Sequence, residues 1–162
     1  MSTETNPQNL GEALTLIRIK KSEIARAYEL RSQEFSDSEN EIEVKKKFQS
    51  NSEAINLKLE ELRKLKTRIE KTNHETIIDT PDGKMTVSEA ILLIGNYRSL
   101  LSDLQELRSK YKVSDYSLSD KKVKYYFGLN PQELEKEIAV LEMKKARLDS
   151  FLQVWNWKTQ LK

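Results

Sequence analysis

Hydrophobic residues recur along most of the chain at steps of three, four or seven, the spacing that places side chains on one side of an α-helix. In the first such segment they are Leu10, Leu14, Ile17, Ile24, Tyr28 and Phe35. Lys21 and Arg31 interrupt this stripe, and polar positions of that kind weaken a helical seam but fix its register or its partner. The polar, acidic stretch at residues 36–43 is predicted to be a loop or the frayed start of a second helix.

A heptad pattern predicts that the second helix runs to about Lys71. Its core positions are Phe48, Ile55, Leu62 and Ile69, with Leu59 and Leu65 on the same side. The helix is expected to end at Thr72 and Asn73, because asparagine tolerates the left-handed backbone that often follows a last turn.

Residues 74–87 are predicted to form a β-hairpin insertion. The turn signal is Thr80-Pro81-Asp82-Gly83, in which proline presets one backbone angle and glycine accepts a positive φ. A third helix then begins at Thr86, since Thr86 and Glu89 have the spacing of a capping box.

The third helix carries a wide apolar stripe. Its members are Ala90, Leu93, Ile94, Tyr97, Leu100, Leu101, Leu104, Leu107 and Tyr111. A helix that is apolar over so much of its circumference contacts more than one neighbour, which predicts a bundle centre or an oligomer interface.

The last helix is predicted to start at Asn130-Pro131, with asparagine as the N-cap, proline at the first position and Glu133 at the third. Its seam consists of Leu134, Ile138, Leu141, Leu148, Leu152 and Trp155, with Lys145 as a polar exception. Together the patterns predict a mainly α fold of long antiparallel helices, arranged as a coiled-coil-like bundle in a single helical domain over residues 1–162. Residues 113–129 are predicted to form a loop that could include a third strand paired with the hairpin.

Composition narrows the classes of function. The 162 residues carry a net charge of +2, which argues against a dedicated duplex-binding protein. The chain has no cysteine, which excludes disulfides, thiolate metal sites and a cysteine nucleophile and fits a cytoplasmic protein. No secretion signal is recognisable, and the longest apolar run, at residues 90–94, is far shorter than the roughly 20 residues that span a bilayer. An intracellular protein without a membrane segment is therefore expected.

Few residues are candidates for chemistry. His74 and Glu75 could begin a metal site, but zinc takes three or four protein ligands and His74 is the chain's single histidine. Asp79, Asp82 and Glu89 could gather around Mg²⁺ or Ca²⁺ in a metal-dependent enzyme, although turn chemistry explains Asp82 and the cap explains Glu89. We therefore predict no cofactor, no metal ion and no catalytic residue.

A candidate nucleic-acid patch lies in the lysine- and tyrosine-rich segment at residues 110–127. Its members are Lys110, Lys112, Lys121, Lys122, Lys124 and Tyr125. Lysines contact phosphates and aromatic rings stack on bases, so a nucleic-acid-binding module is an alternative function. The structural interpretation is favoured, because alternating residues of a strand bury one face and lysines at its edge discourage aggregation.

The two tryptophans near the C-terminus, Trp155 and Trp157, more often anchor a core or a subunit contact than a ligand. With Tyr97, Leu101 and Leu104 of the wide stripe they form the predicted oligomer interface. The predicted function is that of a non-enzymatic structural or scaffolding protein that forms a helical homo-oligomer.

Five segments stand in this order along nearly the whole chain: LGEAL, RIEKTNHET, DGKMTVSEA, YSLSDKKVKY and ARLDSFLQVWNWKTQL. Together they resemble the bacterial septicolysin-like family of small coiled-coil proteins. The most specific parts of the resemblance are Thr72-Asn73, Leu148-Asp149, Gln153 and Asn156-Trp157. The chain differs from that family's pattern at IGNYRSL, where an Arg-Asp pair is expected. The resemblance implies helical homo-oligomers such as hexamers and no established catalytic activity.

Overall fold

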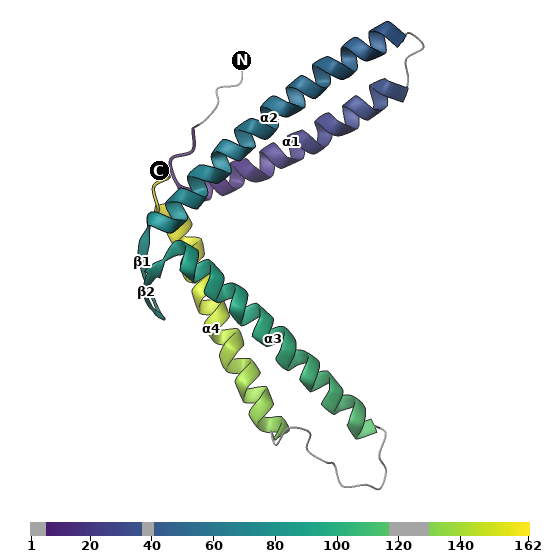
Figure 1. Cartoon of the computed structure of the whole chain (residues 1–162). Coiled ribbons are helices and arrows are strands. Elements are labelled where there is room, and N and C mark those ends of the chain that lie inside the picture. The colour runs from purple at the N-terminus through teal and green to yellow at the C-terminus, as the bar shows by residue number, and fades with distance from the viewer. Residues whose placement is uncertain (1–5, 37–40, 117–129) are drawn as a thin grey trace. The chain divides into compact units, whose positions relative to one another are not determined.

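The computed structural model of the chain describes residues 6–36, 41–116 and 130–162. Within these ranges it contains four helices and one antiparallel hairpin (Figure 1). The helices are α1 (Leu10–Ser36), α2 (Glu41–Glu75), α3 (Val87–Tyr116) and α4 (Pro131–Lys158), and the strands are β1 (Ile77–Thr80) and β2 (Gly83–Thr86). The prediction of a mainly α fold with a small β-hairpin is confirmed.

The chain packs as two compact units rather than around one centre. The first unit combines the residues up to Thr76 with Trp155–Lys162, and the second unit is Ile77–Val154. The single domain predicted over residues 1–162 stays a prediction, and the two units are described separately below.

In the first unit α1 and α2 lie side by side and run in opposite directions (Figure 1). Two reciprocal ion pairs mark their register, Lys20 with Glu61 at 2.7 Å and Lys58 with Glu23 at 3.0 Å. A core forms where the start of α1 meets the later part of α2 and the C-terminal segment. It consists of Leu10, Ala13, Leu65, Ile69 and Leu161, with Leu16 and Ile17 packed against it. The antiparallel prediction thus holds for this pair of helices.

Arg31, a polar interruption of the predicted stripe, has partners in the fold. Its guanidinium lies 5.0 Å from the ring centroid of Phe48 on α2 and 5.2 Å from that of Tyr28, and it donates a hydrogen bond to Ser52 at 3.1 Å. The cation–π contact with Phe48 and the hydrogen bond to Ser52 link α1 to α2 here, whereas Tyr28 belongs to α1 itself. Phe48, predicted as a core heptad position, is instead 46% exposed, and Leu59 is exposed as well.

The second helix ends at Glu75, four residues beyond the predicted end at Lys71. Thr72 is fully buried, and its hydroxyl donates to the Arg68 carbonyl at 2.8 Å while accepting the Lys162 N–H at 3.0 Å. The Thr76 N–H continues the helical pattern by donating to the Thr72 carbonyl at 3.0 Å. The predicted end was wrong because asparagine permits a left-handed backbone but does not impose one, and the C-terminal segment secures the extra turn.

The C-terminal segment lies against the start of α1. The Leu10 N–H donates to the Thr159 carbonyl at 3.0 Å, and the Leu161 N–H donates to the Gln8 carbonyl at 2.8 Å. The ammonium of Lys162 also lies 3.1 Å from Glu75. Residues at the two ends of the described chain therefore close the first unit through backbone hydrogen bonds.

The hairpin matches its sequence signals. Ile77 pairs with Thr86 and Thr80 pairs with Gly83, whose φ is 115°. The Thr80 hydroxyl donates to the Gly83 carbonyl at 2.7 Å and accepts the Asp82 N–H at 3.2 Å, which ties the turn together.

Both predicted helix starts in the second unit are also confirmed. The Thr86 N–H donates to Glu89 at 2.7 Å, and the Glu89 N–H donates to the Thr86 hydroxyl at 3.1 Å. At the start of α4, the Gln132 N–H donates to the Asn130 side chain at 2.9 Å and the Asn130 N–H to Glu133 at 3.2 Å.

Helices α3 and α4 run antiparallel within the second unit (Figure 1), with Leu101, Leu134 and Ile138 as their shared core. The end of α3 at Tyr116 corrects the loop predicted from residue 113, because a helical backbone can continue past the last residue of its apolar stripe. Residues 117–129, where the third strand was predicted, lie outside the described residues.

Candidate functional site

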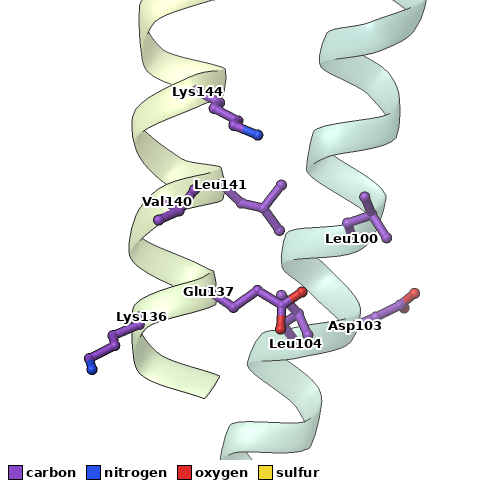
Figure 2. A pocket seen from close by; sticks show the side chains of 8 residues that line it. All are labelled: Leu100, Asp103, Leu104, Lys136, Glu137, Val140, Leu141 and Lys144. Atoms are coloured by element: carbon purple, nitrogen blue, oxygen red, sulfur yellow. The ribbon is translucent and has the colours of Figure 1, made fainter. Parts of the chain in front are cut away.

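A groove of about 450 Å³ runs between α3 and α4 of the second unit (Figure 2). It is lined by Leu100, Asp103 and Leu104 of α3 and by Lys136, Glu137, Val140, Leu141 and Lys144 of α4. The backbones of α3 and α4 lie farther apart than those of α1 and α2, so side chains of the two helices leave space between them. Leu104 and Leu141 pack on the core below and also form the floor of the groove.

Apolar side chains around the groove remain open to solvent. Leu100 is 49% exposed although it is next to the buried Leu101, and Val140 is 45% exposed although it lies two residues after the buried Ile138. Leu92 on α3 and Met143 on α4 are further exposed apolar residues of the same two helices. Exposed apolar side chains that line a groove are a feature of interaction sites in soluble proteins.

Four charged side chains border this apolar floor, two of each sign. They are Asp103, Lys136, Glu137 and Lys144, and among the described residues none of the four takes part in an ion pair. Figure 2 shows Glu137, Leu141 and Lys144 extending from α4 on the side of α3, whereas Lys136 extends the other way.

Other charges of the same helices are paired within the chain. Arg98 lies 3.6 Å from Asp149, and Lys145 lies 2.7 Å from the same carboxylate. Lys145, the polar exception of the predicted seam, is thus neutralised by its own helix. The groove therefore combines an apolar floor with charges that the described part of the chain leaves unpaired.

Residues 31–161 match a protein family described as a family of unknown function, DUF6847. The chain belongs to this family. A crystal structure of a functionally unknown conserved protein from Corynebacterium diphtheriae is similar to this DUF6847 member, with a TM-score of 0.67 over 97% of this chain and 100% of that chain. The two sequences are 20% identical, so the similarity shows the fold alone. No curated protein is significantly similar to the chain.

Glu89, one of the acidic residues considered for a metal site, is hydrogen-bonded locally in this DUF6847 member. The pKa of the Glu89 carboxyl is lowered by hydrogen bonds from Thr86. The backbone N–H has the larger effect and the hydroxyl adds to it. His74 lies exposed in the last turn of α2, in the first unit. Across residues 6–36, 41–116 and 130–162, no three histidine, aspartate or glutamate side chains gather as metal ligands.

The lysine-rich segment is described in part. The Lys110 ammonium lies 2.6 Å from Glu106 one turn earlier in α3, and this hydrogen bond lowers the pKa of Glu106. Lys112 belongs to α3, while Lys121, Lys122, Lys124 and Tyr125 lie outside the described residues. The nucleic-acid patch stays a prediction.

The residues of the predicted oligomer interface fall in both units. Leu101 is 7% exposed and packs with Leu134 and Ile138 inside the second unit, and Leu104 is half-buried beside it. Tyr97 is half-buried, and burial, reinforced by the negative charge of Asp82, raises the pKa of its hydroxyl.

The two tryptophans belong to the first unit. Trp155 is half-buried, whereas Trp157 places its indole ring on Gly11 of α1 and remains 60% exposed. The predicted oligomer interface therefore includes residues that pack within the chain, such as Leu101, and one that is largely exposed, Trp157. The interface itself stays a prediction.

Sequence reasoning missed Val140, Glu137 and Lys144 because they lie beside the main seam of α4. A signal was present in the second, weaker stripe formed by Val140, Met143 and Val154, all of which are exposed. No helix among the described residues contains an apolar stretch long enough to cross a membrane.

Proposed function

We propose that this DUF6847 member is a non-enzymatic structural or scaffolding protein that assembles with copies of itself through the groove between α3 and α4. The observation that carries the proposal is the exposure of Leu100 and Val140 on either side of an apolar floor. Burying such side chains against a partner removes apolar surface from water, at roughly 25 cal/mol for each Å².

The shape of the surface supports a helical partner. An elongated channel between two helices accepts the apolar face of a third helix, a common mode of recognition between helical proteins. One side of α3 packs on α4 through Leu101, while Leu100 and Leu92 remain exposed. The wide stripe of α3 therefore has one side in contact within the chain and another side available to a second copy. The lack of cysteine fits an assembly in the cytoplasm.

The solution mass at low and high salt tests the proposal. A fixed multiple of 18.9 kDa under both conditions is expected, because apolar contacts are not screened by salt. A monomer under both conditions would overturn the proposal. Association that appears only at low salt and only with copurifying nucleic acid would favour the nucleic-acid-binding alternative.

Leu100→Glu is the informative variant, because Leu101→Asp would damage the interior of the second unit itself. Leu30→Glu on α1 is the matched control, since Leu30 is 48% exposed and Leu100 is 49% exposed. We expect Leu100→Glu to lower the assembled mass and Leu30→Glu to leave it unchanged. The reverse pattern would place the contact on the first unit.

A further inference from the structure

We infer that the groove is occupied by α4 of a second copy lying antiparallel to the first α4, so that Glu137 of each copy faces Lys144 of the other. This inference rests on the proposed self-assembly and adds the partner's segment, direction and register. It is carried by the positions of the two charges within the groove and by their lack of partners in the described chain.

The two charges share one line along α4. Glu137 and Lys144 are seven residues apart, which corresponds to about two helical turns, a rise of about 10.5 Å and an angular difference of about 20°. Both line the groove, and Figure 2 shows both extending toward the side of α3. Val140 and Leu141 lie between them, so one acidic and one basic group bracket an apolar centre.

This arrangement is self-complementary under a two-fold axis. Glu137 and Lys144 are equally distant along the helix from the midpoint between Val140 and Leu141. An axis through that midpoint, perpendicular to α4, places each Glu137 opposite the second copy's Lys144 and brings the four central apolar residues together. Parallel helices in register would instead place like charges opposite each other, so the charges select the antiparallel direction.

Local pairing does not use these charges. Side chains pair along a helix at spacings of three and four residues. Around Glu137 these positions hold Glu133, Leu134, Val140 and Leu141, and around Lys144 they hold Val140, Leu141, Arg147 and Leu148. Neither residue has an oppositely charged neighbour at these spacings, in contrast to Lys145, which pairs with Asp149 at 2.7 Å.

Charge exchange tests the register while leaving the core of the chain unchanged, because Glu137 and Lys144 are both exposed. Glu137→Lys and Lys144→Glu are made singly and together, and sedimentation velocity at low ionic strength gives the mass of each. Each single variant replaces two attractive contacts in a dimer by two repulsive ones, and we expect the dissociation constant to rise about tenfold. The double variant restores both contacts and should regain the wild-type constant.

Mixing the two single variants tests the proposed register more directly. The Glu137→Lys chain carries two lysines at these positions and the Lys144→Glu chain carries two glutamates, so each chain alone repels itself. An equimolar mixture should associate as strongly as the wild type. Lys66→Glu and Glu70→Lys, which make the same charge changes on exposed positions of α2, serve as matched controls and should show no loss alone and no gain on mixing.

The outcomes separate this inference from the proposed function. Single variants that keep the wild-type mass, or weakened variants that neither the second substitution nor mixing restores, would overturn the register while the wild-type assembly still supported the scaffold. In that case the groove would have a different occupant. A wild-type chain that is monomeric throughout would overturn both.

Discussion

Replacing Gly11 by alanine tests the contact that packs the end of α4 onto the start of α1 in the first unit. A Cβ atom built on Gly11 would lie 2.6 Å from Cδ2, 2.8 Å from Cε3 and 2.9 Å from Cε2 of Trp157. Carbon atoms in contact prefer about 3.5–4.0 Å, so the indole ring would have to move by about 1 Å. Gly95, in the middle of α3, is the matched control because a Cβ there meets no atom within 4 Å.

The same substitution should have opposite effects at the two positions. At Gly95, alanine loses less backbone entropy on folding and should stabilise the protein by about 0.5–1 kcal/mol. At Gly11, overpacking against the indole costs about 1–3 kcal/mol and outweighs the gain in helix propensity. We expect the two variants to differ by about 2 kcal/mol, with Gly11→Ala the less stable.

Urea unfolding followed by circular dichroism measures the difference, at one protein concentration because self-assembly makes apparent stability depend on concentration. A double-mutant cycle with Trp157→Ala isolates the contact, since removing the indole should make Gly11→Ala neutral or stabilising. If Gly11→Ala raised stability as much as Gly95→Ala does, the close contact between Gly11 and Trp157 would be refuted.

Two further predictions concern the hairpin and the helix that follows it. Gly83→Val should lower the free energy of unfolding by about 1–3 kcal/mol, because a β-branched residue is forced to a φ of 115°. Gly83→Asn should be tolerated better. Equal melting temperatures for the two variants would contradict the turn geometry. Glu89→Gln should remove a pH-dependent contribution to the free energy of unfolding. The hydrogen bonds from Thr86 lower the pKa of Glu89 in the folded state below its ordinary value of 4.5. The carboxylate therefore stabilises the fold above pH 4.5, and this stabilisation is lost as the pH falls through the lowered pKa. The stability difference between wild type and variant should therefore shrink on acidification in urea titrations across pH, and a constant difference would show that the charge of Glu89 has no role in the cap.

The helix caps and the turn of the hairpin were predictable because each depends on residues a few positions apart. The capping pairs Thr86–Glu89 and Asn130–Glu133 and the positive φ of Gly83 are visible in four-residue patterns, and the structure confirms all three. Another helix start, at Asn9, was missed although it follows the same rule: the Asn9 side chain accepts the Glu12 N–H at 2.9 Å.

Burial depended on contacts between distant residues and was predicted less well. Helical spacing placed Leu14 in the first stripe, but Ala13 is buried in its place and Leu14 is 37% exposed. Phe48 has the heptad position of a core residue, yet it lies beside the guanidinium of Arg31. Periodicity identifies residues on one side of a helix, but the width of the contact and the size of the opposing side chain decide which of them are covered.

The sequence by itself thus determined where α3 and α4 begin, where the hairpin turns and that the fold is mainly helical, because these properties arise from backbone hydrogen bonds and side chains close along the chain. Only the tertiary structure decided that Thr72 extends α2 through its bond to Lys162, that Leu101 is buried while Leu100 is open, and that Glu137 and Lys144 border one groove. Each of these depends on contacts between segments far apart in the sequence, which are set by how the packed side chains fill the space between them.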